Sequence, residues 1–395
     1  MPDRKFKADH LFTGKEVLGE NNVLITGEDG VVKDIVPVKD AGDDIEIFHG
    51  LLSPGFINCH CHLELSHMKN VIEPGTGLVE FLLKVISLRS TGKEEIEAAM
   101  QAADEEMYNN GIVAVGDISN TTNSIETKRR SKIEYFNFIE VLGFTEVNAR
   151  EKLAPYLAVY KEFCEAGFAA RTSLVPHAPY TVSKTMFQLI GDLSAGKVIS
   201  IHNQETLAED DLYRNKSGDF FKFYHDLNIN TDFFQPCNTS SLQAYLPMLA
   251  KAKKLVLVHN TCTTQADLDF ALRQVGREGH AIYWCLCPNA NLYIENRLPP
   301  VELFVQNRRN ILLGTDSYSS NYSLNILDEI KTLQKNFVSV PMKELLQWAT
   351  LNGAKALSVD DKFGSFEKGK RPGVLLISNL VNRNISTLST ITRLL

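Results

Sequence analysis

Short apolar runs rich in valine, isoleucine and leucine recur through the middle of the chain. Each run ends in a polar cluster and is followed by a stretch whose apolar residues have helical spacing. Eight such runs occur, at residues 51–58, 112–118, 133–142, 170–176, 197–201, 254–258, 281–287 and 311–314. Buried parallel strands have both faces covered and therefore appear as continuous apolar runs. The pattern predicts eight buried parallel strands.

The stretches between the runs have the pattern of amphipathic helices. Residues 78–89 and 94–107 repeat apolar side chains at helical intervals, and Ser183 and Thr264 precede two further periodic segments as candidate N-caps. Strands that alternate with helices indicate an α/β fold with a parallel sheet. An open doubly wound sheet is one solution, but eight units over this length favour closure into a (β/α)8 TIM barrel.

The two ends of the chain have a different pattern. Residues 1–52 alternate apolar and polar positions around glycine and aspartate turns, which is typical of β-hairpins. Residues 358–395 contain another β-like run, GVLLISNL. We therefore expect a small β-sandwich domain formed by residues 1–52 and 358–395, and a catalytic barrel domain over residues 53–357.

The segment between the fifth and sixth runs, residues 206–236, is rich in aromatic residues. They include Phe220, Phe221, Phe223, Tyr224, Phe233 and Phe234. One interpretation is an aromatic lid over an active site. The other, which we favour, is an amphipathic helix that packs on the barrel.

Composition narrows the class of protein. The 395 residues include 41 basic and 48 acidic side chains, a net charge of −7, whereas nucleic-acid-binding proteins usually carry a basic excess. The sequence has no apolar run long enough for a membrane span, and residues 1–10 lack the apolar core of a signal peptide. Seven cysteines without framework spacing indicate free thiols. We expect a cytoplasmic protein with neither a nucleic-acid nor a membrane partner.

A His-x-His motif ends the first run. His60 and His62 are two residues apart on a strand, so their side chains lie on the same face and could bind one metal ion. Two histidines at this spacing also occur by chance. Their place at the C-terminal end of a predicted barrel strand favours a role in chemistry, because barrel enzymes carry their active sites there.

Further polar residues follow the other runs. His177, His202 and His259 follow the fourth, fifth and sixth runs, and Asp316 lies just past the eighth. Any one of them could be a structural residue with satisfied hydrogen bonds. Together they place ligand-type side chains at the ends of several strands, which indicates a site at the mouth of the barrel.

Glu205 lies three residues after His202. That spacing lets the carboxylate turn back toward a metal without binding it, where it could act as a general base and later as an acid. A carboxylate at a helix N-terminus is the alternative, since the helix dipole favours it. The neighbouring histidines favour the catalytic role.

This set of motifs resembles the amidohydrolase superfamily across essentially the whole chain, and within it the mononuclear metal-dependent deaminases. The resemblance implies that His60, His62, His202 and Asp316 hold one divalent metal ion, which is zinc or, alternatively, iron. Relatives with two metal ions usually carry a lysine on the fourth strand, and the fourth run here, ARTSLVP, has none.

The same resemblance implies a role for each neighbouring residue. Asp316 would accept a proton from the attacking water, and His259 would orient that water. Glu205 would carry protons to the ring and to the leaving amino group. The segment PHAPYT at residues 176–181 is similar to one in adenine-nucleoside deaminases, in which the histidine, here His177, contacts the substrate.

Shorter segments narrow the resemblance. HLELS at residues 62–66 and FLLKVISLR at residues 81–89 are similar to aminodeoxyfutalosine deaminases, with S-adenosylhomocysteine and methylthioadenosine deaminases as near relatives. They imply that Glu64 contacts the substrate; the alternative is a carboxylate that orients a ligand histidine. The sequence leaves open which arginine binds a carboxylate tail, with candidates Arg89, Arg129, Arg130 and Arg171.

We therefore expect a hydrolase that removes ammonia from an amino-substituted aromatic heterocycle, and an adenine nucleoside derivative before others. Guanine or cytosine deamination, triazine dechlorination and ring-amide hydrolysis are alternatives on the same scaffold. A non-catalytic scaffold is an alternative from another class. The resemblance further implies a small-molecule substrate and a homodimer.

Overall fold

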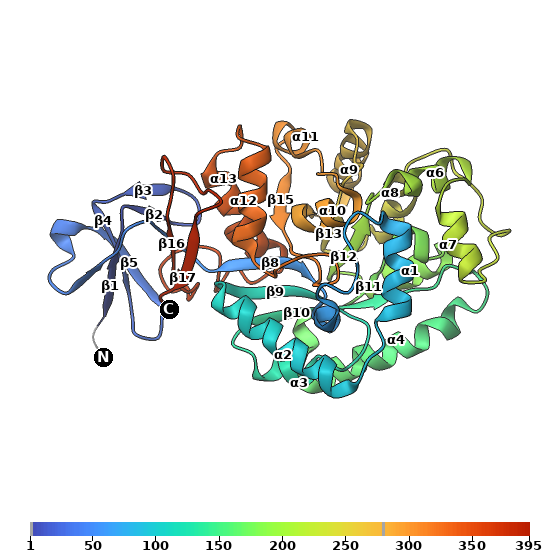
Figure 1. The fold of residues 1–395 in the computed structure, drawn as a ribbon, viewed down its shortest axis with the longest axis horizontal. Helices are drawn as coiled ribbons and strands as arrows, with labels where there is room; N and C mark the ends of the chain where they lie inside the picture. Colours follow the sequence, from blue (N-terminus) through green and yellow to red (C-terminus); the bar gives the residue numbers. More distant parts are fainter. Residues whose placement is uncertain (1–2, 279–280) are drawn as a thin grey trace.

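The computed structural model describes residues 3–278 and 281–395. Figure 1 shows two parts side by side: strands from both ends of the chain on the left, and a larger body of alternating strands and helices on the right. The strands of the larger body form two parallel four-stranded sheets, ordered β11-β10-β9-β8 and β12-β13-β14-β15. These strands are β8 Phe56–Cys61, β9 Ile112–Ser119, β10 Glu134–Val141, β11 Thr172–Pro176, β12 Val198–Asn203, β13 Lys254–His259, β14 Ala281–Leu286 and β15 Asn310–Leu313.

All eight predicted barrel strands are confirmed, and the first run is divided between two sheets. Residues Leu51–Ser53 form β7 in the terminal part, and the barrel strand β8 begins only at Phe56. Gly55 between them has no room for a side chain, because a Cβ atom there would lie 2.6 Å from the carbonyl oxygen of Pro372. The chain therefore passes from one sheet to the next within a single apolar run.

The two four-stranded sheets each form half of the barrel, and they meet along two seams, one between β15 and β8 and the other between β11 and β12. At the first seam, the backbone N–H groups of Thr315 and Asp316 donate to the carbonyl oxygen of His60, at 3.0 and 3.1 Å. At the second seam, the N–H of His202 donates to the carbonyl oxygen of His177 at 3.0 Å. The barrel is therefore closed. His60 and Asp316 lie at the first seam and His177 and His202 at the second, and all four are candidate site residues from the sequence.

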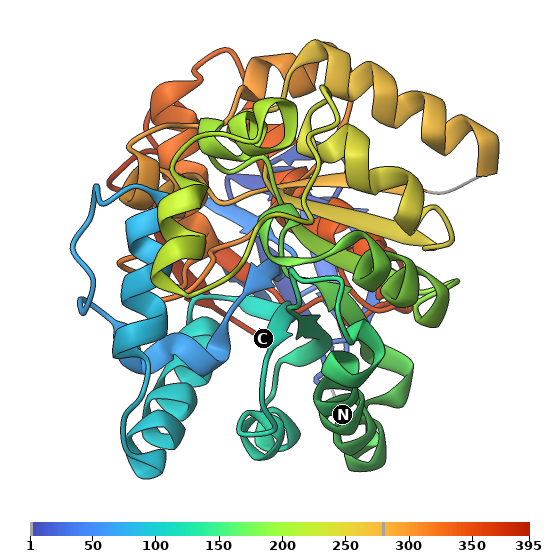
Figure 2. The same cartoon turned by 90° about the vertical axis from the view of Figure 1, so that its right-hand side faces the viewer.

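Helices surround the barrel strands, as the end-on view shows (Figure 2). Ser183 and Thr264 are confirmed as N-caps, because their hydroxyls accept the N–H groups of Met186 and Asp267 at 3.3 and 3.4 Å. The helices are α1 Leu78–Leu88, α2 Lys93–Asn109, α3 Ile125–Arg130, α4 Ala149–Phe163, α5 Lys184–Leu193, α6 Leu207–Asn215, α7 Phe220–Asp226, α8 Ser241–Tyr245, α9 Gln265–Glu278, α10 Pro288–Glu295, α11 Val301–Gln306, α12 Ile326–Asn336, α13 Met342–Gln347 and α14 Gly353–Ala356.

The terminal strands form two sheets that face each other. One sheet has the order β5-β4-β1-β6 and the other β17-β16-β7-β2-β3. Phe6 and Leu24 of the first sheet and Leu52 of the second share a buried apolar cluster with Phe366. The strands are β1 Arg4–Lys7, β2 His10–Phe12, β3 Val17–Gly19, β4 Asn22–Thr26, β5 Val32–Pro37, β6 Ile45–Ile47, β16 Leu375–Ser378 and β17 Thr390–Arg393.

This arrangement confirms a TIM barrel with a small β-sandwich built from both termini. We propose residues 1–52 and 358–395 as the limits of the sandwich and residues 53–357 as those of the barrel. No helix in the part of the chain that the structure describes is long and apolar enough to cross a membrane.

The aromatic segment packs on the barrel, as the favoured interpretation predicts. Phe220 and Tyr224 of α7 are buried. Phe220 stacks on Tyr180 with ring centroids 4.2 Å apart, and Tyr224 stacks on Phe144 at 4.4 Å. Phe223 of the same helix lines the cavity described below, so α7 also supplies one wall of the candidate site.

Candidate active site

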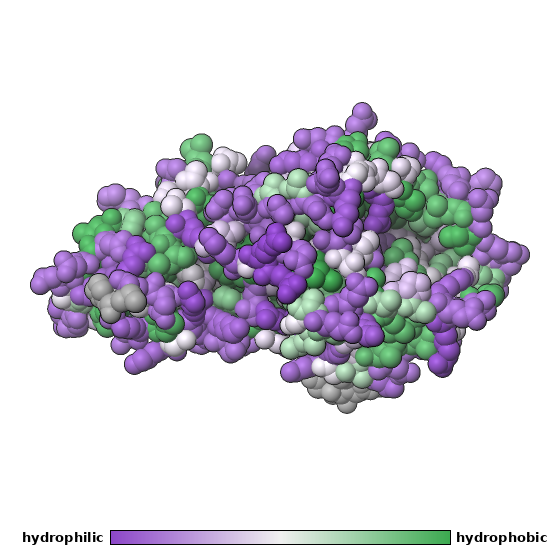
Figure 3. Space-filling model, turned by 90° about the horizontal axis from the view of Figure 1, so that it is seen from below, coloured by the Kyte–Doolittle hydropathy of each residue, from purple (hydrophilic) through white to green (hydrophobic). Residues whose placement is uncertain are grey.

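A cavity opens at the C-terminal ends of the barrel strands. It is lined by polar groups from β10, β12 and β13 and from the segments that follow β8, β9, β11 and β15, and by an apolar wall from α1 and α7. In the space-filling view, hydrophobic residues gather at the right-hand end of the molecule, where Figure 1 places α1 and α7 (Figure 3). A deep polar floor with apolar walls is typical of a small-molecule site.

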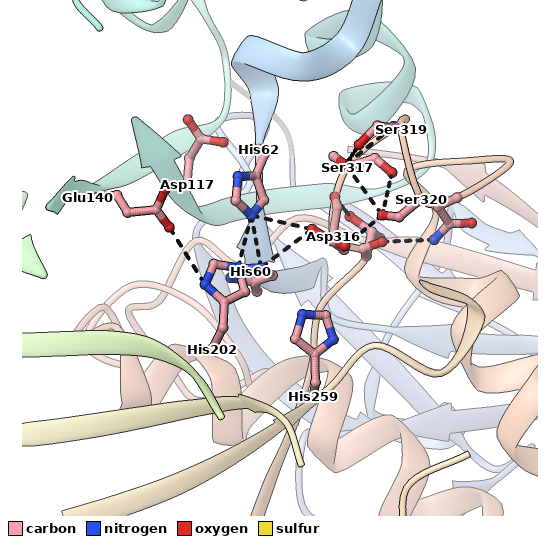
Figure 4. Close-up of polar contacts among 12 residues, drawn as sticks. His60, His62, Asp117, Glu140, His202, His259, Asp316, Ser317, Ser319 and Ser320 are labelled. Carbon is pink, nitrogen blue, oxygen red and sulfur yellow. Dashed lines mark hydrogen bonds and ion pairs between the residues drawn. The ribbon is translucent and has the colours of Figure 1, made fainter. Parts of the chain in front are cut away.

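Four of the predicted ligand residues converge on one point. The Nε2 atom of His62 lies 3.2 Å from the Nε2 atoms of both His60 and His202. The Oδ1 atom of Asp316 lies 3.3 Å from the same atom of His62 and 3.5 Å from Nε2 of His60 (Figure 4). All four side chains are buried. The strand ends therefore bring together three imidazoles and one carboxylate from β8, β12 and the loop after β15.

The protonation states of His62 and His202 fit a bound cation. Burial lowers the pKa of His62 to about 3 and that of His202 well below its usual value. Nδ1 of His202 lies 2.8 Å from the carbonyl oxygen of His177 and donates to it, which leaves Nε2 unprotonated and facing the cluster. Unprotonated nitrogens this close repel one another unless a cation lies between them. The residues present fit a divalent metal.

Asp316 completes the donor set as a carboxylate. Burial alone would raise its pKa, but the hydrogen bond from His60 and the neighbouring imidazoles hold the pKa well below its usual range. Its Oδ2 atom accepts a hydrogen bond from the Ser320 hydroxyl at 2.5 Å. Nitrogen and oxygen donors of this kind suit zinc and also iron.

The backbone at the strand ends is held in an uncommon conformation. Gln204, His259 and Asp316 have positive φ angles of 48°, 72° and 58°. Non-glycine residues in the left-handed region cost of order 1–3 kcal/mol each and persist where surrounding contacts fix them, often at functional sites. These turns bend the chain at the strand ends that carry the converging side chains.

Glu205 lies beside the imidazole cluster without joining it. Its Oε1 atom accepts a hydrogen bond from the Tyr180 hydroxyl at 2.8 Å, and Oε2 lies 3.5 Å from Nε2 of His259. Burial raises the pKa of Glu205 to about 8. A carboxyl group with such a pKa exchanges its proton near neutral pH, as a proton carrier must.

His177 and His259 also face the cavity. The Nδ1 atom of His177 lies 2.7 Å from the Thr181 hydroxyl, and its ring centroid lies 4.8 Å from that of His202. His259 is buried, and burial lowers its pKa. Both residues present neutral imidazoles toward the space in which a ligand would lie.

Glu64 is placed differently from the other predicted site residues. Its carboxylate accepts hydrogen bonds from the N–H groups of Asn120 and Thr121, at 3.0 and 3.1 Å, and from the hydroxyls of Thr121 and Ser124. It is absent from the described cavity lining, whereas Asn120 is present there. The geometry makes Glu64 a support for the loop after β9, and its contact with substrate stays a prediction.

The sequence does not single out several polar residues that line the cavity, among them Tyr180 and Glu140. Tyr180 lies within the PHAPYT segment, where only the histidine was singled out. Glu140 lies inside the apolar strand β10, and a carboxylate in such a run was the available signal. Its Oε2 atom accepts a hydrogen bond from Asn120 at 2.9 Å, and Oε1 lies 3.6 Å from Nδ1 of His202.

We expect Tyr180→Phe to reduce kcat about tenfold while metal content stays unchanged, because Glu205 loses its hydrogen-bond donor. Tyr213→Phe is a matched control, since this buried tyrosine donates to the carbonyl oxygen of Pro179 and lies outside the described cavity lining. Steady-state ammonia release measures both. Equal losses in the two variants would contradict a specific role for Tyr180.

A buried ion pair supports the segment that follows His62. The Lys128 ammonium lies 2.6 Å from Oδ2 of Asp117, and both side chains are 0% exposed. The other oxygen of Asp117 accepts the backbone N–H of Leu63 at 2.8 Å. Lys128 also donates to the Ser119 hydroxyl at 2.8 Å. The pair therefore fixes the chain one residue beyond the His-x-His motif.

Replacing Lys128 with methionine should lower the free energy of unfolding by about 3–5 kcal/mol, because Asp117 would remain buried without its partner. Urea unfolding followed by circular dichroism measures this change. Lys84→Met, on the outer side of α1, is the control and should shift stability by less than about 0.5 kcal/mol. A similar shift in both variants would show that the ion pair contributes little.

Comparisons with known proteins agree with this geometry. The model of the Amidohydrolase family matches residues 51–391. An adenosine deaminase of Helicobacter pylori is 28% identical over 334 residues, covering 82% of this chain and 78% of that protein. An aminodeoxyfutalosine deaminase of Nitratiruptor sp. is 26% identical over 341 residues, covering 83% and 79%. The crystal structure of Helicobacter pylori aminofutalosine deaminase with methylthio-coformycin has a TM-score of 0.81 at 25% identity, covering 96% of this chain and 93% of that one.

Proposed function

The chain belongs to the amidohydrolase family, and from this premise we propose that it is a metal-dependent hydrolytic deaminase of an adenine nucleoside derivative. The observation that carries the proposal is the Glu205 carboxyl group, which has a raised pKa and lies between Tyr180 and His259 beside the imidazole cluster. The similar proteins include deaminases of adenosine, 5′-deoxyadenosine, 5-methylthioadenosine and S-adenosylhomocysteine, and aminodeoxyfutalosine.

His60, His62, His202 and Asp316 would hold one divalent metal ion in this proposal. When bound, such an ion lowers the pKa of a water molecule toward about 7 and so supplies a nucleophile at neutral pH. This assignment is supported by four short distances between their donor atoms, which run from 3.2 to 3.5 Å.

The remaining steps belong to side chains of this protein. His259 orients the attacking water by a hydrogen bond, and Asp316 accepts its first proton. Glu205 donates a proton to the ring nitrogen, which makes the adjacent carbon electrophilic. The water oxygen then bonds to that carbon. Glu205, now a carboxylate, takes the proton of the new hydroxyl group and passes it to the amino group, so that a carbonyl forms as the carbon–nitrogen bond breaks and ammonia leaves. The proton held by Asp316 returns to Glu205 for the next turnover. His177, which lines the same cavity, contacts the ring.

Ammonia release from a panel of amines tests the proposal. The zinc-loaded protein is given adenosine, 5-methylthioadenosine, S-adenosylhomocysteine, aminodeoxyfutalosine, guanine and cytosine. We expect release from at least one adenine nucleoside, and none from that compound with heat-inactivated protein. Release from guanine or cytosine alone would replace the adenine assignment. Chloride release from a chlorotriazine without any deamination would replace the reaction class.

Zinc as the metal, a homodimer and a cytoplasmic location stay predictions from the sequence. Metal analysis of the protein purified without added metal distinguishes zinc from iron. Analytical ultracentrifugation gives the oligomeric state.

A further inference from the structure

The carboxyl group of Glu209 is buried next to the candidate site, and the proposed mechanism does not use it. Glu209 is 0% exposed and lies outside the described cavity lining. A glutamate is almost never fully buried without polar partners, because taking the group out of water costs free energy. Among the residues that the structure describes, no lysine, arginine or histidine forms an ion pair with Glu209. Its hydrogen bonds must therefore account for its place.

The partners of Glu209 include the backbone N–H groups of the turn that carries Glu205. Its Oε1 atom accepts the N–H of Gln204 at 3.1 Å, and Oε2 accepts the N–H of Glu205 at 3.4 Å. The hydroxyl of Ser241, at the start of α8, also donates to Oε1. Both carboxyl oxygens are therefore engaged, and two of these three donors belong to the turn between β12 and α6.

This contact goes beyond ordinary helix capping. Helix α6 begins at Leu207 with Thr206 as its N-cap, so Glu209 is the third residue of the helix. A glutamate at that position can accept the N–H of the N-cap residue itself, as in a capping box. Here the carboxyl group reaches one and two residues further back, to Glu205 and Gln204. It therefore holds the segment that presents Glu205.

The turn needs such support because its backbone is strained. Gln204 has a φ angle of 48°, in the left-handed region. The side chain of Gln204 is held separately, since Nε2 donates to Asp267 at 3.0 Å and Oε1 accepts the Thr263 hydroxyl at 2.8 Å. Glu209 holds the main chain of the same turn. Without it, the buried N–H of Glu205 would lose its acceptor and the turn would relax.

The direction of the Glu205 side chain depends on this turn. One carboxyl oxygen accepts the Tyr180 hydroxyl at 2.8 Å, and the other lies 3.5 Å from Nε2 of His259. These contacts fix the outer end of the side chain, whereas Glu209 fixes the backbone from which the side chain starts. A shift of about 1 Å in a reacting group can cost about 10²-fold in rate.

We propose that Glu209 is a positioning residue for the deamination, which holds the turn at residues 204–205 and thereby aims the Glu205 carboxyl group at the substrate. This inference rests on the proposed deaminase function and deepens it. Glu209 acts only through Glu205, so its contribution disappears when Glu205 can no longer carry a proton.

Glu209→Gln tests this role with little change of shape. The single oxygen of glutamine faces two donors, from Gln204 and Ser241, so its amide nitrogen faces the N–H of Glu205 and cannot accept it. We expect kcat to fall about 10- to 100-fold, while KM and metal content stay within about twofold of the wild-type values. Both kinetic constants come from ammonia release with the adenine nucleoside that the wild-type protein deaminates fastest.

A double-mutant cycle with Glu205→Gln separates positioning from a general structural effect. In the Glu205→Gln background, Glu209→Gln should change kcat by less than about threefold, because the group that it positions is already inactive. A purely structural loss would lower turnover by the same factor in both backgrounds.

Asp104→Asn is a matched control for the loss of a buried carboxylate. Asp104 accepts the hydroxyls of Ser131 and Tyr135, both at 2.6 Å, and lies outside the described cavity lining. It bonds to no backbone group of the turn, so kcat should stay within about twofold of the wild-type value. A loss as large as that in Glu209→Gln would show that buried carboxylates matter to turnover without regard to position.

Ser241→Ala reaches the same carboxyl group from another helix. It removes one donor to Glu209 and leaves the carboxyl group in place, so we expect kcat to fall about three- to tenfold, again only when Glu205 is present. Thermal unfolding verifies that each variant is folded. Should Glu209→Gln fail to fold, Ser241→Ala and its cycle with Glu205→Gln decide the question.

The outcomes distinguish this inference from the proposed function. Wild-type kcat in Glu209→Gln, or an equal loss in the Glu205→Gln background, overturns the positioning role and leaves the deaminase function in place. A raised KM with unchanged kcat also overturns it, because the effect would then lie in substrate binding. Absence of ammonia from every adenine nucleoside with the wild-type protein overturns the proposed function and the positioning role together.

Discussion

Glu205→Gln is expected to lower kcat by about 10⁴-fold while the protein retains its full metal content. Glutamine has nearly the same shape and keeps an oxygen for the Tyr180 hydroxyl, which donates to Glu205 at 2.8 Å. It cannot take up and release a proton, and a positioned acid or base contributes about 10²- to 10⁴-fold. Because one group serves both the ring nitrogen and the amino group, we expect the upper end of that range.

The test pairs turnover with metal analysis on the same sample. Glu329→Gln is a matched control, because burial also raises the pKa of Glu329 to about 8 while its carboxylate bonds to Asn289 and Asn321. Glu329 is outside the described cavity lining. Turnover within tenfold of the wild-type value in Glu205→Gln would exclude Glu205 as the proton carrier.

Removing the metal is expected to lower the turnover rate at least about 10³-fold, and adding one equivalent of zinc should restore it. The nucleophile at neutral pH depends on a lowered pKa of water, which the metal supplies. A metal that binds only the folded state also raises the unfolding temperature in a concentration-dependent way. Chelation followed by titration with zinc measures both effects.

His202→Ala should reproduce the loss because it removes one of the four converging donors. His225→Ala is the control, since the side chain of His225 is 89% exposed on α7. The variant at position 202 is expected to bind less than about one-tenth of an equivalent of metal under conditions that saturate the wild-type protein. Full occupancy and turnover in His202→Ala would remove this residue from the ligand set.

The sequence was sufficient to predict the barrel and the imidazole cluster because both follow from simple periodicity. A continuous apolar run identifies a strand buried on both faces. Parallel strands of a closed barrel end at one rim, so residues that follow separate runs must lie near one another. His62 and His202 are 140 positions apart, and their Nε2 atoms are 3.2 Å apart.

Positions that depend on packing could not be predicted in the same way. The apolar run over residues 51–58 contains the end of a sandwich strand and the start of a barrel strand. Both strands are apolar, so the point at which the chain changes sheets cannot be predicted from hydrophobicity. Whether the carboxylate of Glu64 faces a ligand or the loop after β9 depends on where that loop lies. Arg89 lines the cavity, whereas the other candidate arginines pair with glutamates elsewhere. The sequence alone does not show this difference.

Isotope transfer from solvent to product tests the central claim of hydrolytic deamination most directly. An adenine nucleoside that releases ammonia in the panel is incubated with the zinc-loaded protein in water enriched in oxygen-18, and the product is analysed by mass spectrometry. We predict one labelled oxygen at the former amino carbon for each ammonia released, and both products formed about 10⁴-fold more slowly by Glu205→Gln. Ammonia without a labelled product, or a labelled product without ammonia, would contradict the account.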